Sequence, residues 1–263
     1  MVTSFPRDPA SPHGGVEAVS VSLARALAGR SDLELHVVTV DGRTPALEVI
    51  SWGGATVHRL PGSWRNLLTY AVGAGRRQVS AYLNDLEPDV VHAHDTYGIM
   101  VKGLPLPRLF TVHGFIYEDT RYTGGLKARL RSELWRRVET AGWADQPHIV
   151  AISPYVRERL RGIARGGIHD IENPVDETLF QLPREASSRV IFSAAAICPR
   201  KNTLGLVRSV ELLARDGLAV ELRLAGSATD PAYAEVVQAY ARNHGTVGSV
   251  TFLGPISSGA VRV

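Results

Sequence analysis

Two patterns of apolar and polar residues alternate along most of this chain, one typical of strands and the other typical of helices. Short runs rich in β-branched residues predict strands, and apolar residues three or four positions apart predict helices. The predicted strands are residues 1–5, 33–40, 55–60, 89–94, 108–113, 148–152, 189–194, 220–224 and 249–253. The predicted helices are residues 16–29, 64–86 (one long helix or two short ones), 126–138, 155–163, 203–214 and 231–243.

Strands that alternate with helices in this way indicate βαβ units and parallel sheets, so the predicted fold class is α/β. The alternation stops over residues 173–188, which contain two prolines and predict a linker. We therefore expect two Rossmann-like domains, residues 1–180 and 181–263. The second holds three predicted strands and two helices, about half of a six-stranded doubly wound sheet, so we expect it to be incomplete.

Composition places the chain among ordinary globular proteins, with 44% hydrophobic and 21% charged residues. No stretch approaches the ~18 consecutive apolar residues of a transmembrane helix, and no secretory signal pattern is present. The single cysteine, Cys198, excludes a disulfide framework and a cysteine zinc site. We expect a cytoplasmic protein. The net charge of +3 is too small to suggest a nucleic-acid partner.

Small polar clusters follow several of the predicted strands. In open parallel sheets, ligands bind beyond the carboxyl ends of the strands. Clusters at four such ends therefore predict a ligand cleft. They are Gly14-Gly15 before the first helix, His94-Asp95, His113-Gly114 and Ser153-Pro154.

Each cluster suits part of a phosphorylated sugar ligand. Gly14 and Gly15 let the backbone approach an anion at a helix N-terminus, where free N–H groups bind phosphate. His94 and His113 can both donate and accept hydrogen bonds with sugar hydroxyls. The alternatives are a glycine loop that enters a helix, strand-end histidines bonded to backbone, and a Ser153 that only caps the following helix.

A basic turn, Pro199-Arg200-Lys201-Asn202, joins the first predicted strand of the second domain to its helix. Two cations at a strand-to-helix turn suit a diphosphate. The alternative is a solvated basic turn.

Taken in order, these residues resemble glycosyltransferase family 4, whose members have the two-domain GT-B fold. The resemblance covers nearly the whole chain, and its motifs are short. The matching stretches are Phe5-Pro6 to Glu17, Asp89 to His94, Thr111 to Gly114, Ala151 to Ser153, Glu172 to Asp176, Pro199 to Asn202, Leu224 to Gly226 and Val250 to Gly254.

The resemblance implies retaining, metal-independent transfer of a sugar from a nucleotide-sugar to an acceptor hydroxyl, with no cofactor. His113 would contact the donor sugar near the reacting centre, and Lys201 would neutralise the leaving diphosphate. Gly14, Gly15, Ser153 and Arg200 would bind the donor. The family has an arginine at the position of Ala196, and Arg200 would replace it here. His94 and Asp95 would bind the acceptor, a glycan or a lipid-linked molecule.

Two other functions compete with this interpretation. A dinucleotide oxidoreductase would use Asp41, at the end of the second predicted strand, to bind ribose. The segment around Gly14 lacks the G-x-G-x-x-G pattern, which disfavours it. The stronger alternative is a non-catalytic, truncated glycosyltransferase-like binding protein, because the paired glutamates of the family are expected beyond Val263.

Basic and apolar residues also gather on the predicted helix near residues 121–137, which suggests contact with a membrane surface. Cations flank an apolar side formed by Leu126, Leu130, Leu134 and Trp135. A basic amphipathic helix of this kind can lie on an anionic membrane. The alternative is an ordinary surface helix with its leucines in the core and its arginines in solvent. The cations are Arg121, Lys127, Arg129, Arg131, Arg136 and Arg137.

Overall fold

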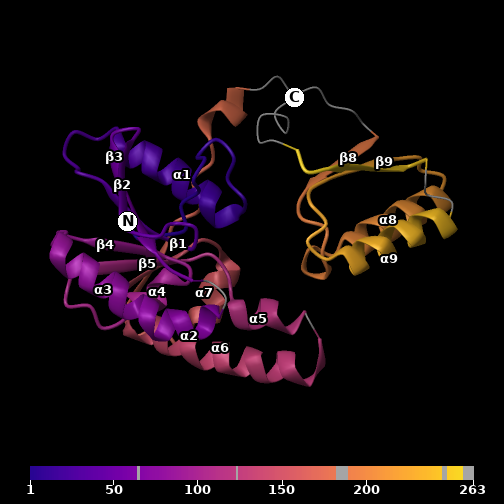
Figure 1. Ribbon diagram of the computed structural model, residues 1–263. Coiled ribbons are helices and arrows are strands. Elements are labelled where there is room, and N and C mark those ends of the chain that lie inside the picture. The colour runs from indigo at the N-terminus through magenta and orange to yellow at the C-terminus, as the bar shows by residue number, and fades with distance from the viewer. Residues whose placement is uncertain (64–65, 123, 182–188, 245–247, 257–263) are drawn as a thin grey trace. The chain divides into compact units, whose positions relative to one another are not determined.

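A computed structural model of the chain describes all residues except 64–65, 123, 182–188, 245–247 and 257–263 (Figure 1). The chain divides into two compact units, Met1–Asp176 and Glu177–Val263. Both units are α/β, as the sequence predicts.

The first unit contains seven helices and seven strands among the described residues. The helices are α1 (Gly15–Ala28), α2 (Leu67–Val72), α3 (Ala74–Leu86), α4 (Tyr97–Met100), α5 (Ile116–Arg121), α6 (Gly125–Asp145) and α7 (Pro154–Leu160). The strands are β1 (His36–Asp41), β2 (Glu48–Trp52), β3 (Ala55–Pro61), β4 (Val91–His94), β5 (Arg108–Val112), β6 (His148–Ala151) and β7 (Gly167–Asp170).

The strands of this unit form two groups, in the orders β1-β3-β2 and β4-β5-β6-β7. All neighbours are parallel except β2 and β3. Val2 joins the groups, because it pairs in parallel with Val38 of β1 on one side and with Ala93 of β4 on the other. The strand predicted for residues 1–5 is therefore reduced to one bridging residue, although it lies at the centre of the sheet.

The long helical pattern before β4 resolves into two helices. Helix α2 ends at Gly73, whose φ and ψ of −113° and −106° are not helical, and α3 begins at the next residue. A Cβ at Gly73 would lie 2.7 Å from the carbonyl oxygen of Thr69, so the bend requires a glycine. Of the two sequence alternatives, the pair of short helices is correct.

Helix α6 buries a different face from the one that its leucines suggest. Leu126, Leu130 and Leu134 are 82%, 65% and 44% exposed. The tryptophans offer more apolar area than the leucines, and small residues let α5 pack closely, so the other face enters the core. The alternative drawn from the sequence, an ordinary surface helix with buried leucines, is wrong. The buried residues are Ala128, Ser132, Trp135, Glu139, Gly142 and Trp143.

Short or partly exposed elements escaped the sequence patterns. Strand β2 is antiparallel at the sheet edge and exposes Val49 and Ile50, so it shows no buried run. Strand β7 has only four residues, none of them fully buried. Helices α4 and α5 have four and six residues, too few for a helical period to show.

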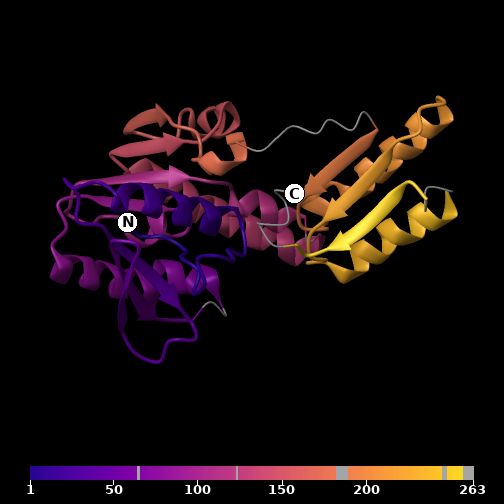
Figure 2. The same cartoon turned by 90° about the horizontal axis from the view of Figure 1, so that it is seen from above.

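The second unit contains a parallel sheet of three described strands in the order β10-β9-β8 (Figure 2). Helices α8 and α9 pack against this sheet around a core that includes Val207, Leu222, Val237 and Val250. The elements are η1 (Glu177–Gln181), β8 (Val190–Ala194), η2 (Pro199–Lys201), α8 (Thr203–Arg215), β9 (Glu221–Ala225), α9 (Pro231–Asn243) and β10 (Val250–Gly254).

Candidate functional site

The carboxyl ends of the parallel strands β4, β5 and β6 meet at one edge of the first sheet, which we call the carboxyl edge. His94 is the last residue of β4, and His113 directly follows β5. Ser153 follows β6 and begins α7. The register of β4 and β5 pairs His94 with Thr111, so His113 lies just beyond His94. The structure thus places three of the strand-end residues that the sequence singles out, His94, His113 and Ser153, at one edge.

Gly14 and Gly15 form the entrance to α1, with Gly14 at the N-cap. The N-terminus of α1 has no side-chain cap at Gly14, and a Cβ added to either glycine would meet nothing within 4 Å. The φ of Gly14 is 168°, an extended value that any residue adopts. Neither local packing nor this backbone angle requires glycine at Gly14, so the open space suits close approach of a ligand to the first N–H groups of the helix.

His94 and His113 form a hydrogen-bonded pair at the carboxyl edge. Their Nδ1 and Nε2 atoms are 3.0 Å apart, and their rings stack at an interplanar angle of 17°. Burial lowers the pKa of His113 to about 4. Burial, followed by the neighbouring histidines, lowers the pKa of His94 to about 2. Both rings are therefore neutral at pH 7 and can act as hydrogen-bonding groups, not as cations.

The ring of His92 packs against that of His94, with centroids 4.1 Å apart, but its hydrogen bond goes to a different partner. Its Nε2 lies 2.7 Å from the hydroxyl of Thr111, on the neighbouring strand. This bond joins β4 to β5 and gives His92 a structural role.

Asp95 follows His94 in an unusual conformation. Its φ of 48° lies in the left-handed region, which non-glycine residues rarely adopt. Burial raises the pKa of its carboxyl to about 6, against a lowering hydrogen bond from the backbone of Thr96. A carboxyl with a raised pKa, next in sequence to a buried histidine of a hydrogen-bonded pair, is typical of a functional site.

Glu139 is a buried carboxyl that the sequence analysis missed. It projects from α6 and accepts hydrogen bonds of 2.9 Å from the backbone N–H groups of Ile116 and Tyr117. It thereby holds the start of α5 immediately after the His113 turn. Burial raises its pKa to about 7, although these N–H groups lower it. The sequence contains one signal for its burial: Glu139 lies four residues from each of the two buried tryptophans of α6 and therefore on the same face of the helix.

Ser153 caps α7, because its hydroxyl oxygen accepts a hydrogen bond of 3.3 Å from the N–H of Val156. The capping alternative therefore describes its position. A role for Ser153 in donor binding stays a prediction.

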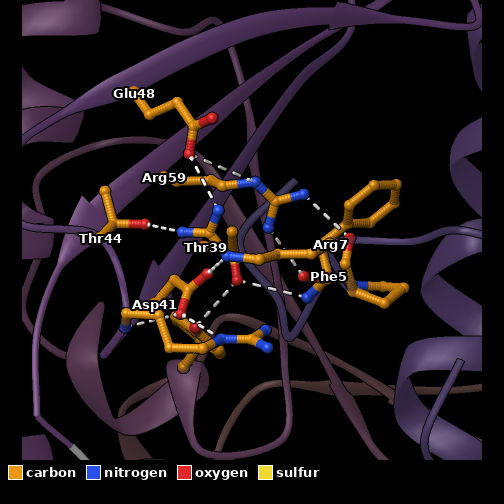
Figure 3. Close-up of polar contacts among 10 residues, drawn as sticks. Phe5, Arg7, Thr39, Asp41, Thr44, Glu48 and Arg59 are labelled. Atoms are coloured by element: carbon orange, nitrogen blue, oxygen red, sulfur yellow. Dashed lines mark hydrogen bonds and ion pairs between the residues drawn. The ribbon is translucent and has the colours of Figure 1, made fainter.

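A cavity of about 420 Å³ lies beside the Gly14 turn and was not foreseen from the sequence. Arg7 crosses its wall and contacts Asp41 and Thr44 (Figure 3). Arg59 is buried and donates hydrogen bonds of 3.2 and 2.9 Å to the carbonyls of Phe5 and Pro6. These contacts fix the loop that leads from Val2 to α1. Asp41, which would bind ribose in the oxidoreductase alternative, instead forms ion pairs with Arg7 and Arg43.

In the second unit, Arg200 and Lys201 lie in the 3-10 turn η2, between β8 and α8. Both side chains are exposed. The turn ends at Asn202, whose φ of 51° is left-handed. At the end of the next strand, a Cβ at Gly226 would lie 2.0 Å from the carbonyl oxygen of Ala195. The family-like Leu224-Ala225-Gly226 motif therefore contains a glycine that close packing of the backbone requires.

The described residues contain no helix long and apolar enough to cross a membrane. In the same part of the chain, no three histidine, cysteine or carboxylate side chains are grouped to hold a metal ion.

Comparisons with known proteins identify relatives of this fold. Sucrose-phosphate synthase from Thermosynechococcus elongatus is similar, with a TM-score of 0.73 and 16% identity over 99% of this chain and 72% of that one. Anabaena HepE, determined in complex with UDP-glucose, has a TM-score of 0.65 and 13% identity over 97% and 69%. A glycosyltransferase from Rickettsia africae has a TM-score of 0.54 and 15% identity over 97% and 68%. A search of curated proteins finds no match.

The model of Glycosyltransferase Family 4 matches residues 13–179, more than half of the chain. This range includes the Gly14 turn, the histidine pair and Ser153. The chain therefore belongs to glycosyltransferase family 4 and is a glycosyltransferase with the GT-B fold.

Proposed function

We propose that the protein transfers a sugar from a nucleotide-sugar to an acceptor hydroxyl, with retention at the anomeric carbon and without a metal ion. The observation that carries the proposal is the neutral histidine pair at the carboxyl edge, in the same unit as an unobstructed glycine turn that begins α1. In parallel α/β sheets this edge is where ligands bind. A uridine diphosphate sugar is the first donor to test, because HepE was determined with UDP-glucose.

Each residue has a proposed role that follows from its chemistry. The backbone at Gly14 and Gly15 approaches the donor diphosphate, and Ser153 and Arg200 contribute to donor binding. His113 is a neutral hydrogen-bonding partner for the donor sugar. Lys201 offsets the negative charge that develops on the leaving diphosphate, which is the largest change in charge during transfer. Asp95 lies on the acceptor side, where His94, which is 1% exposed, acts through its contact with His113.

Single substitutions test these roles in a transfer assay that follows nucleoside diphosphate release. His113→Ala and Lys201→Ala are each expected to lower the rate by about 10²-fold or more, because one lost transition-state contact costs about 3 kcal/mol. His148→Ala and Lys102→Ala are matched controls that remove the same side-chain types elsewhere.

Unchanged turnover in both site variants would refute the proposed roles. Saturable binding of a nucleotide-sugar with no transfer to any acceptor would instead favour the alternative, a non-catalytic binding protein.

We also propose that the acceptor is lipid-linked and that α6 contacts an anionic membrane at the cytoplasmic face. Leu126, Leu130 and Leu134 form an exposed ridge, which we call the leucine ridge. Exposed cations flank it, namely Arg121, Lys127, Arg129, Arg131, Arg136 and Arg137. Two of them, Arg136 and Arg137, pair with Glu133 at 2.8 and 3.1 Å. An apolar ridge bordered by excess positive charge matches the boundary between acyl chains and anionic headgroups.

Liposome co-sedimentation tests this contact. Binding to vesicles with anionic lipid, and much weaker binding to neutral vesicles, is expected. Equal and negligible binding to both would leave a soluble glycan as the better acceptor.

A further inference from the structure

The histidine pair at the carboxyl edge contains one buried atom without a partner. His94 is 1% exposed, and its Nδ1 contacts His113. Its other ring nitrogen, Nε2, is buried and has no hydrogen-bond partner among the described residues. The ring of His92 lies against it, with centroids 4.1 Å apart, and leaves that side of His94 enclosed.

A contact of 3.0 Å between two neutral imidazoles contains one proton. In the first arrangement, His94 donates from Nδ1 to His113, and His94 Nε2 is a bare nitrogen. In the second, His113 donates from Nε2, and His94 then carries a buried Nε2–H group with no acceptor. Orphaned buried N–H groups are rarer in proteins than unsatisfied acceptors, so the first arrangement is favoured.

We infer that His94 is a positioning residue that fixes the tautomer of His113, so that His113 presents Nδ1–H as a hydrogen-bond donor. With its Nε2 occupied as an acceptor, His113 must carry its proton on Nδ1. No described residue bonds to that nitrogen. The inference rests on the proposed contact between His113 and the donor sugar, and it specifies that contact: His113 donates to a sugar oxygen and does not accept from a hydroxyl.

The low pKa values of both rings meet one condition of this arrangement, which is that neither ring is charged. Burial keeps both histidines neutral at pH 7, so the pair holds two ring protons in total and the tautomers are distinct species. The other titratable groups that act on His94 are His92, with a pKa lowered to about 4, and the N-terminal amino group, whose pKa burial lowers to about 5.

Long-range ¹H–¹⁵N NMR of histidine-labelled protein reads the tautomer directly, because protonated and bare ring nitrogens have different shifts. In the full chain, His113 is expected to carry its proton on Nδ1 and His94 to have a bare Nε2. A His113 protonated on Nε2 would overturn the inference without any variant.

Three variants separate positioning from packing. His94→Leu removes the donor, so His113 is expected to revert to Nε2–H and transfer to slow about tenfold, as for one lost hydrogen bond. His94→Asn places an amide N–H near the former Nδ1 and is expected to retain the Nδ1–H tautomer. His92→Leu, a matched control on the same strand, is expected to leave the His113 tautomer unchanged.

The outcomes are distinguishable from failure of the proposed function. The same His113 tautomer in His94→Leu as in the unaltered protein, or a tautomer change in His92→Leu as well, would overturn the positioning role. An Nδ1–H tautomer together with full activity of His113→Ala would support the His94 contact and refute the catalytic role of His113.

Discussion

Replacing the leucine ridge with glutamine tests the membrane contact quantitatively. The exposed fractions of Leu126, Leu130 and Leu134 are 82%, 65% and 44%, together about two whole leucine side chains. Burying a leucine contributes about 2 kcal/mol, so full insertion of the ridge contributes about 4 kcal/mol, or about 10³-fold in partitioning. Glutamine has nearly the helix propensity of leucine, so the triple variant should retain α6.

The assay is co-sedimentation with anionic vesicles, with circular dichroism to confirm the fold. The triple glutamine variant is expected to bind at least about tenfold more weakly, even if insertion is shallow. Its residual binding should be lost in high salt, since the cations remain and each contributes about 1 kcal/mol. Leu212→Gln, at an exposed leucine of the second unit, is the matched control. Equal binding of the triple variant and the unaltered protein would refute the reasoning.

Three further substitutions test the scaffold around the site. Glu139 has a folded pKa of about 7 against an ordinary 4.5, so the folded state retains a proton that the unfolded state releases. The contribution of this group to stability should therefore be greatest below about pH 4.5 and fall by about 3 kcal/mol toward pH 8. Glu139→Gln should remove this contribution, which denaturant titrations at pH 5 and pH 8 would measure. The same difference in the free energy of unfolding between the two pH values in the variant and in the unaltered protein would contradict the prediction. Gly226→Ala forces a Cβ to within 2.0 Å of a backbone oxygen and should destabilise by about 2–4 kcal/mol, whereas Gly248→Ala, with open space, should be nearly neutral. Arg59→Met leaves two buried carbonyls without their donor and should lower the free energy of unfolding by about 3 kcal/mol in the same titration. The control Arg43→Met, at an exposed ion pair, should lower it by under about 1 kcal/mol. Equal losses would show that Arg59 does not hold the loop.

The carboxyl edge could be predicted from the sequence because it depends on local signals. His94 and His113 each end a recognisable buried strand, and parallel strands must bring their carboxyl ends to the same edge. The glycine pair likewise precedes a strongly periodic helix. The prediction of an α/β chain needed little more than these periods, whereas the GT-B fold was implied by the resemblance to glycosyltransferase family 4.

Other features depend on packing that the sequence pattern does not encode. Helix α6 carries two apolar stripes, one of leucines and one with the tryptophans. Which stripe is buried depends on the surfaces of α5 and the sheet that pack against the helix. Glu139 is buried because two backbone N–H groups of α5 lie opposite it, a partnership between distant segments. The same holds for Arg59, whose partners are carbonyls of the loop before α1.

The most direct test of the central claim is isothermal titration of the protein with a panel of nucleotide-sugars, beginning with UDP-glucose. The account predicts saturable binding of at least one donor, weakened about tenfold or more by Lys201→Ala through loss of a charge partner for the diphosphate. It predicts no comparable loss in Lys102→Ala. Folded protein that binds no nucleotide-sugar, or binding that Lys201→Ala leaves unchanged, would contradict it.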